Sequence, residues 1–132
     1  MVRVVLAVAL SCLGVGTSIA AEPAGLPGVV LSLRIGNSQG QVGFVLANRS
    51  ASAIEFLGSM GRVPVLAYNP DKLVVKGGCV DPPDLPEFFA YSLKADATLS
   101  FEYTDPSEVN AFGAFVREPS STCWHLAQVR RS

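Results

Sequence analysis

The chain has 132 residues, a formal net charge of −1 at pH 7 and no extended run of lysine and arginine. A near-neutral chain without a basic stripe lacks the electrostatic footprint that nucleic acid binding requires, so no nucleic acid partner is expected. Hydrophobic residues account for 49% of the sequence and charged residues for 16%. This balance excludes a disordered chain and predicts one compact domain.

The first twenty residues have the three-part layout of a secretory signal. A positive start at Arg3 is followed by an apolar run over 4–13 and by small residues that end at Ala20 and Ala21. This layout predicts export, into the periplasm or out of the cell, with cleavage after Ala20 or Ala21. The apolar run is too short to span about 30 Å of hydrocarbon, so no transmembrane segment is expected in the mature chain.

Domain organisation follows from that cleavage site. Residues 1–20 would be the signal, 21–27 a short lead and 28–130 a single domain, and the 112 residues left would carry a net charge of −2. Lipidation at Cys12 is the competing interpretation. Ala9 argues against it, because a large aliphatic residue usually stands three positions before such a cysteine.

Two cysteines remain after cleavage, Cys79 and Cys123. In an oxidising compartment they predict a disulfide, which would close a loop of about 45 residues and stabilise the fold by roughly 4 kcal/mol. A zinc site formed with His125 is the alternative. It has only three ligands and lacks a paired Cys-x-x-Cys, so no metal and no cofactor are expected.

The hydrophobic pattern has a period of two along most of the mature chain. Val29, Leu31 and Leu33 alternate with more polar positions, as in a half-buried strand. Nine short apolar runs are separated by turn residues, at 29–35, 42–48, 53–57, 63–68, 73–76, 88–93, 99–103, 111–117 and 123–129. By analogy with known folds, this pattern predicts an all-β, antiparallel β-sandwich of the immunoglobulin-like type with about seven to nine strands.

The disulfide constrains the connections between these strands. If every consecutive pair formed a hairpin, Cys79 and Cys123 would lie at opposite ends of the sandwich, whereas bridged Cα atoms lie within about 7 Å. The proline-rich segment 77–87 resolves the conflict if it crosses the sandwich as a Greek-key connection. One miscounted strand would resolve it as well.

No catalytic motif is present. His125 is the only histidine, and its neighbours in sequence are a bridging cysteine and apolar residues. Without a nucleophile and an oriented base, no catalytic residue is predicted and the chain is not expected to be an enzyme. A small hydrolase acting through aspartate or glutamate is retained as an alternative.

Asp81, Asp84 and Glu87 stand three residues apart in the proline-rich segment. Oxygen ligands at this spacing are candidates for a weak calcium site, and a solvated acidic loop is the alternative. The tripeptide Asn48-Arg49-Ser50 matches the glycosylation sequon, which predicts a surface turn there.

Phe88, Phe89 and Tyr91 form a candidate interaction patch for an unidentified protein partner. Consecutive strand residues point to opposite faces, so one of the two phenylalanines must leave the core, with Tyr91 on the side of Phe89. The alternative is that both faces are covered, one of them by segment 77–87.

These features predict an exported, non-catalytic β-sandwich that works by surface recognition of another envelope or extracellular component. The alternative function is a small exported inhibitor of a hydrolase, such as a protease or lysozyme, that would insert the 77–87 loop into its target.

Overall fold

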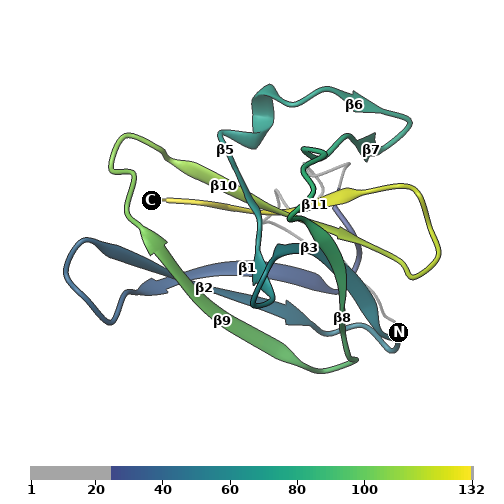
Figure 1. The fold of residues 1–132 in the computed structure, drawn as a ribbon, viewed down its shortest axis with the longest axis horizontal. Helices are drawn as coiled ribbons and strands as arrows, with labels where there is room; N and C mark the ends of the chain where they lie inside the picture. The colour runs from purple at the N-terminus through teal and green to yellow at the C-terminus, as the bar shows by residue number, and fades with distance from the viewer. Residues whose placement is uncertain (1–24, 132) are drawn as a thin grey trace, which may run out of the picture.

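The computed structural model describes residues 25–131 and contains antiparallel strands and no α-helix in that range (Figure 1). The strands are β1 (Val29–Ile35), β2 (Gln41–Asn48), β3 (Ile54–Ser59), β4 (Val63–Pro64), β5 (Leu66–Tyr68), β6 (Val75–Lys76), β7 (Cys79–Val80), β8 (Phe89–Leu93), β9 (Thr98–Thr104), β10 (Ala111–Arg117) and β11 (His125–Arg130), with a 3-10 turn, η2 (Pro70–Lys72), before β6. The predicted all-β antiparallel class with one disulfide is confirmed. The secretory signal and the start of the lead lie outside the described residues, in which no helix is long and apolar enough to span a membrane.

One sheet has the order β1-β2-β9. Its central strand pairs along its whole length with both neighbours, so that Leu46 lies opposite Leu31 and Leu99. The alternating apolar residues of these strands lie on one face and are buried there, among them Leu31, Phe44 and Phe101. Period-two patterning therefore gives this sheet one apolar and one solvated face.

The largest sheet is built around β10, which pairs with β11 on one side and β3 on the other, and β6 and β7 form a separate two-stranded sheet. β8 pairs with β3 and lies at the sheet's opposite edge. β5 also pairs with β10, beyond the end of β3, and both run antiparallel to β10. Thus β3 and β5 run in the same direction, end to end, and together act as one interrupted strand.

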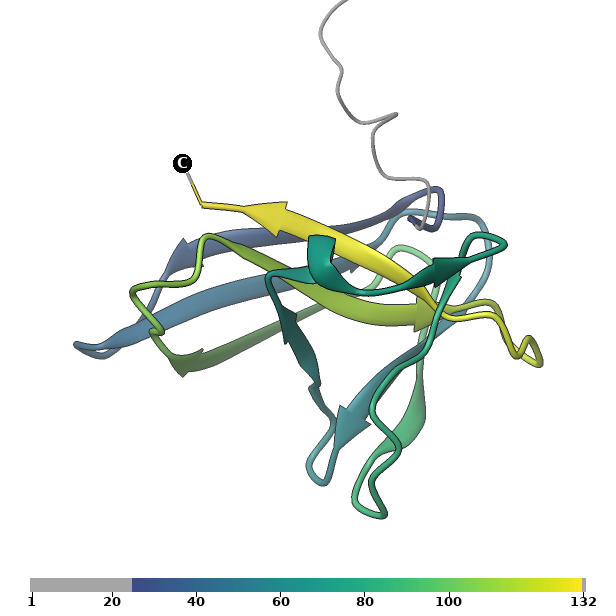
Figure 2. The same cartoon turned by 90° about the horizontal axis from the view of Figure 1, so that it is seen from above.

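Between these two strands the chain makes an excursion. It leaves β10 after Leu57 and returns at Val65, whose N–H donates to the Leu57 carbonyl at 2.9 Å. Within the excursion, Ser59 pairs with Val63 to form a short hairpin. We call residues 58–64 the excursion hairpin; it projects from the body of the molecule in Figure 2.

Side chains of the two sheets meet in the main hydrophobic core. The Phe44 ring of β2 lies 5.3 Å from Phe101 in its own sheet and 5.1 Å from Phe112 in the other, measured between centroids. Phe44, Phe56 and Phe112 are fully buried. The sheets are therefore held together by interlocked aromatic side chains, for which edge-to-face and offset contacts are favourable.

A second hydrophobic cluster covers the outer face of the β10 sheet. Leu57, Phe115 and Leu126 point to this side, where they meet Val80 and Trp124. Partly buried residues of the 65–88 stretch pack over them. Consequently β10 is buried on both faces, with Phe112 turned to the main core and Phe115 to the second cluster.

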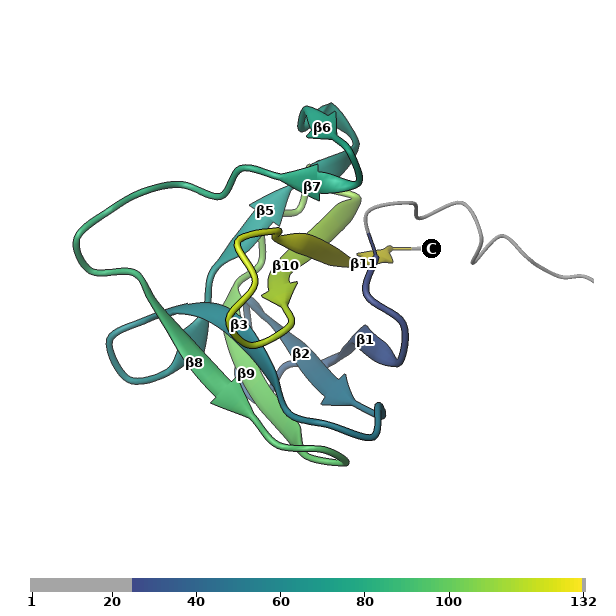
Figure 3. The ribbon, with the colours of Figure 1, turned by 90° about the vertical axis from the view of Figure 1, so that its right-hand side faces the viewer.

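Residues 81–88, which we call the strap, connect opposite edges of this sheet. The strap begins where Val80 bridges Trp124 beside β11, and it ends at Phe89, which pairs with Gly58 at the β8 edge. Figure 3 shows it arching away from the body between β7 and β8. The excursion hairpin and the strap project on the same side of the molecule (Figure 2).

The predicted crossing is thus present, but its geometry differs from the prediction. It starts at Asp81 because Gly77 and Gly78 form the β6–β7 turn, and it joins two edges of one sheet. The alternative of one miscounted strand applies to the runs at 53–57 and 63–68, which count as a single strand along β10. Since β3 and β5 point the same way, the supposed separation of the cysteines disappears.

Candidate functional site

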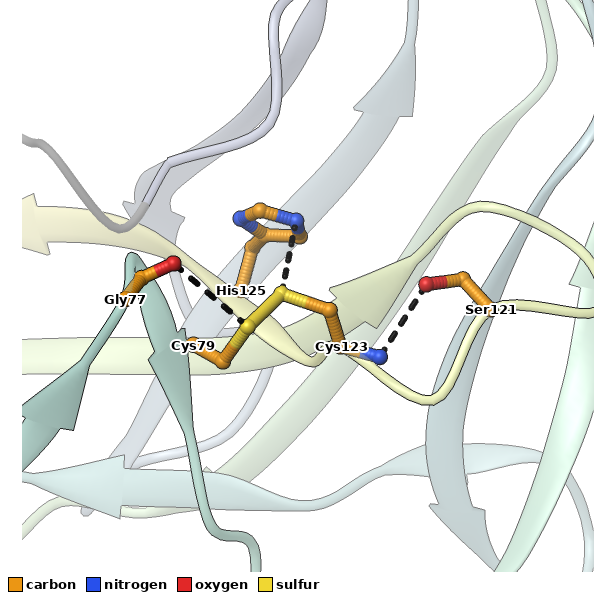
Figure 4. The surroundings of a disulfide bond; sticks show 5 residues. All are labelled: Gly77, Cys79, Ser121, Cys123 and His125. Carbon is orange, nitrogen blue, oxygen red and sulfur yellow. Dashed lines mark hydrogen bonds between the residues drawn. A yellow bond between two sulfur atoms is a disulfide. The ribbon is translucent and has the colours of Figure 1, made fainter.

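The disulfide joins the strap's origin to the start of β11 (Figure 4). Cys79 and Cys123 are bonded, with their Cα atoms 5.2 Å apart, which confirms the predicted pair. The Val80 N–H donates to the Trp124 carbonyl at 2.9 Å beside the bridge, and the Cys123 N–H donates to Ser121 Oγ at 3.0 Å. The bridge therefore lies in a backbone frame that is fixed by separate hydrogen bonds.

The two sulfur atoms have different neighbours (Figure 4). Cys79 Sγ lies 3.7 Å from the Gly77 carbonyl oxygen, whereas Cys123 Sγ lies 3.5 Å from His125 Nε2. The other ring nitrogen, His125 Nδ1, is buried and has no hydrogen-bond partner among the described residues. His125 thus contacts a disulfide sulfur and not a serine or threonine hydroxyl.

The structure separates the residues of the predicted patch. Phe88 packs against the second cluster, while Phe89 remains 51% exposed. Tyr91 is half-buried and stacks on the core residue Phe56, with centroids 5.7 Å apart. The Phe89 ring meets Tyr91 edge-on at 6.4 Å. A row of three rings therefore leads from the core to the surface.

Arg62 belongs to the same surface, although no sequence pattern indicated it. Its guanidinium lies 5.1 Å above the centre of the Tyr91 ring, and its Nη2 donates to the Ser92 carbonyl at 2.8 Å. This places Arg62, on the excursion hairpin, against β8. The contact depends on pairing between segments thirty residues apart, for which no sequence motif exists.

Gly58 makes room for this arrangement. A Cβ atom at that position would lie 2.9 Å from Tyr91 Cδ2 and 3.1 Å from Phe56 Cε2. The two rings therefore pack directly over the glycine backbone, and any side chain there would displace Tyr91.

The candidate calcium ligands are all exposed along the strap. Asp81, Asp84 and Glu87 take part in none of the ion pairs found between residues 25 and 131. Within that range, no group of three or more histidine, cysteine, aspartate or glutamate residues is placed to hold a metal ion. The three carboxylates are therefore solvated and do not form a coordination set in this structure.

The sequon asparagine is part of the interior, contrary to the expected surface turn. Asn48 is fully buried, and its Nδ2 lies 2.9 to 3.1 Å from the carbonyl oxygens of Ser52, Leu93 and Lys94. Its Oδ1 accepts from the backbone N–H and the hydroxyl of Ser50. A side chain so committed is inaccessible to a glycosylating enzyme in the folded protein.

A cleft of about 600 Å³ opens where the β2–β3 and β10–β11 loops meet the N-terminal lead. Leu26 and Ile54 contribute apolar surface, and Glu118 supplies the one carboxylate of the lining. A lone carboxylate without a second acid or a histidine cannot perform the paired acid–base steps of glycoside hydrolysis.

A smaller cleft of about 280 Å³ lies beside β5 and is lined in part by Tyr68, Phe88 and Tyr103. The Tyr103 hydroxyl donates to the Pro64 carbonyl. Burial raises the pKa of Tyr103 above its ordinary value of 10.0, and the nearby Tyr68 raises it further. Tyr103 is therefore protonated at neutral pH and acts as a hydrogen-bond donor between the sheets.

Comparison of the chain with protein-family models, curated proteins and solved structures gives no match.

Proposed function

We propose that the chain is an exported, non-catalytic immunoglobulin-like sandwich that recognises another envelope or extracellular protein through the excursion hairpin and the strap. The strand orders β1-β2-β9 and β11-β10-β3-β8 support the fold assignment. They correspond to the A-B-E and G-F-C-C′ sheets of immunoglobulin-like domains, in the same chain order. On this assignment, strand C is the interrupted strand β3/β5.

The row of rings from Phe56 through Tyr91 to Phe89 is the observation on which the recognition proposal rests. Phe56 is fully buried and Phe89 is half exposed, so the exposed ring is held in place by the core. A ring that is already ordered loses little conformational entropy on binding. Aromatic and arginine side chains also dominate the energetic centres of protein interfaces, which supports a role for this surface.

Other exposed apolar side chains lie on the same two projections. Met60 at the tip of the excursion hairpin is 75% exposed, and Leu85 in the strap is 45% exposed. Together with Phe89 and Arg62 they give an apolar surface that carries one cation and is bordered by the strap's carboxylates. This composition is typical of a protein-binding site.

Export is supported by the layout of residues 1–20 and by the disulfide, because disulfides persist in oxidising compartments. Both are compatible with the periplasm and with full secretion.

The test is a cross-linked pull-down of the tagged mature protein from its host's envelope and medium, followed by affinity measurement with the dominant partner. Phe89→Ser and Met60→Ser should each weaken binding by about tenfold or more, because each removes an ordered apolar contact. Ile35→Ser is the matched control, since Ile35 is 92% exposed at the end of β1, outside this surface. Equal affinity for all three variants would exclude the surface.

Inhibition of a hydrolase is the second candidate function, favoured by how the strap is anchored. Its start is fixed by the disulfide and the Val80–Trp124 bridge, and its end by Phe88 in the second cluster. Titration of the protein into proteases and lysozymes should reveal a sensitive enzyme if the strap enters an active-site cleft. Leu85→Ser should then abolish inhibition, whereas Val74→Ser, which alters an exposed residue outside the strap, should not.

A further inference from the structure

We propose that the Cys79–Cys123 bridge is a thiol–disulfide exchange site with a defined direction. Cys79 is the sulfur that an incoming thiolate attacks, Cys123 is the sulfur that leaves, and His125 donates a hydrogen bond to the leaving thiolate. This site does not depend on the recognition surface, and its direction is set by the different atoms that face the two sulfurs.

The Cys123 side is set up to stabilise a thiolate. His125 Nδ1 is buried and unpaired among residues 25–131, so a proton there would leave an N–H donor buried without an acceptor. The tautomer with its proton on Nε2 avoids this cost and directs that N–H at Cys123 Sγ, 3.5 Å away. A hydrogen bond donated by the imidazole N–H favours the thiolate over the thiol.

The Cys79 side favours the opposite protonation state. Its sulfur faces the Gly77 carbonyl oxygen at 3.7 Å, an acceptor that can receive a hydrogen bond from a thiol but repels a thiolate. The better leaving group is the sulfur whose thiolate is more stable, and exchange proceeds faster when that sulfur leaves. The neighbours therefore direct attack to Cys79 Sγ.

A dithiol reductant opens the bridge in two steps. A reductant thiolate attacks Cys79 Sγ, the protein S–S bond breaks, and its electron pair stays on Cys123 Sγ as a thiolate that accepts from His125 Nε2–H. The second reductant thiolate then attacks the reductant sulfur of the mixed disulfide and releases Cys79. Cys79 and Cys123 each take up one proton when they become thiols, and the reductant ends as its own disulfide.

The frame keeps the two thiols adjacent after reduction. Lys76 pairs with Cys79 in the β6–β7 hairpin, and the Val80 N–H bonds to the Trp124 carbonyl, so neither contact needs the covalent bridge. Both cysteines are half-buried and lie at the surface end of the second cluster's cover, not within the core clusters. Held at this separation, the reduced pair can close again, and the exchange is reversible.

The direct test uses the oxidised mature protein and glutathione, a monothiol, with rapid acid quenching. The free thiol is alkylated and the adducts are located by peptide mass spectrometry. We expect glutathione on Cys79 and the alkyl group on Cys123, in an excess of about fivefold or more over the reverse arrangement. Equal amounts, or an excess of glutathione on Cys123, would overturn the proposal.

A variant pair tests the role of His125. His125→Phe keeps a ring but removes the donor, so it should slow exchange about fivefold and reduce the excess of the Cys79 adduct, of which the Gly77 carbonyl retains a part. Ser121→Ala removes only the acceptor of the Cys123 backbone N–H and should retain the wild-type adduct ratio. If His125→Phe does not fold by circular dichroism, the wild-type ratio alone decides. An unchanged ratio in a folded His125→Phe protein would refute the assigned role.

Discussion

The amide of Asn48 joins three parts of the chain. It connects the end of β2 to the 50–52 turn and to the carbonyl groups that close β8, all within a fully buried environment. Buried carbonyl groups that lose their donor pay the full desolvation penalty. Asn48 therefore fixes how β8 leaves its sheet for the turn that leads to β9.

Asn48→Ala should lower the free energy of unfolding by about 3 kcal/mol, because it leaves several buried polar groups without partners. Urea titration followed by circular dichroism measures the change. Asn37→Ala is the control and should cost less than about 0.5 kcal/mol, since Asn37 is exposed and its side chain makes no hydrogen bond within the described range. Equal stability of both variants would show that the amide network contributes nothing.

Tyr103 makes a second residue-level contribution, one that depends on pH. Burial, with a smaller effect of Tyr68, raises its pKa in the folded protein above 10.0, so above that pH the unfolded chain loses the proton first. The free energy of unfolding should therefore fall as the pH rises from about 10 toward the folded-state pKa. Below pH 10 the contribution is fully present.

Denaturant titrations at several pH values between about 8 and 11 test this dependence. Tyr103→Phe should be less stable at neutral pH, because the hydrogen bond to the Pro64 carbonyl is lost, and its stability should fall less steeply at high pH. Parallel loss of stability in the two proteins would contradict the assignment.

For single residues, the sequence predicted those features that depend only on residue type and on neighbouring positions in the chain. The Cys79–Cys123 pair followed from compartment and count, whereas strand alternation predicted only that Phe88 and Phe89 point to opposite faces. Arg62 and Asn48 could not be predicted. Arg62 bonds to Ser92, thirty residues away. Asn48 bonds to Leu93 and Lys94 as well as to its own turn, whose composition suggested a surface position instead.

Among the elements, β10 shows how burial on two faces changes a sequence pattern. Its residues, Ala-Phe-Gly-Ala-Phe-Val-Arg, form a nearly continuous apolar run, whereas β1 alternates. The second cluster explains the difference. The outer face of β10 is covered by this cluster, so Phe115 is buried there, whereas the outer face of β1 is solvated.

The bridge should stabilise the arrangement of the β6–β7 hairpin against β11. Cys79→Ser combined with Cys123→Ser should lower the free energy of unfolding by up to about 4 kcal/mol, and the melting temperature by more than about 10 °C. Differential scanning calorimetry measures both. The same shift is expected for the wild type under reduction, and an unchanged midpoint would mean that the bridge does not constrain the unfolded chain.

Strand positions were predictable from periodicity, but their partners were not. The runs at 53–57 and 63–68 look like two arms of a hairpin, and the structure places them along the same line beside β10. The backbone hydrogen bond from the Val65 N–H to the Leu57 carbonyl holds the two runs in line, and the pattern of side chains does not encode this bond.

In the whole molecule, β10 lies between the main core and the second cluster and contributes side chains to both. Phe112 and Phe115 come from the same strand, so loss of either cluster removes support from the other. The two clusters should therefore unfold in one cooperative transition.

Trp124, the single tryptophan, lies in the second cluster and reports on it, while near-ultraviolet tyrosine signals report on the region around Tyr91 and Tyr103. We expect coincident urea midpoints for the two probes. Phe115→Ala should lower the free energy of unfolding by about 3–5 kcal/mol and so lower both urea midpoints. Val74→Ala, at an exposed site, should shift neither midpoint. A tryptophan transition at lower urea would instead show that the strap and its cover unfold separately.

At this scale, the all-β class was predictable from the period of the hydrophobic pattern, and the crossing segment from its prolines. The covering of one sheet by the 65–88 stretch was not, since it depends on which edge each end of the strap reaches.

The excursion hairpin is a part of this surface whose length can vary. The Val65 N–H donates to the Leu57 carbonyl at its base, and Gly58 and Ser59 pair with Pro64 and Val63 just beyond, so the register of β3 and β5 along β10 is held below the tip. The tip at Gly61 points into open space, and a Cβ there would meet no atom within 4 Å. Peptides of different length could therefore be grafted into this loop while the scaffold keeps its frame, as in a display protein.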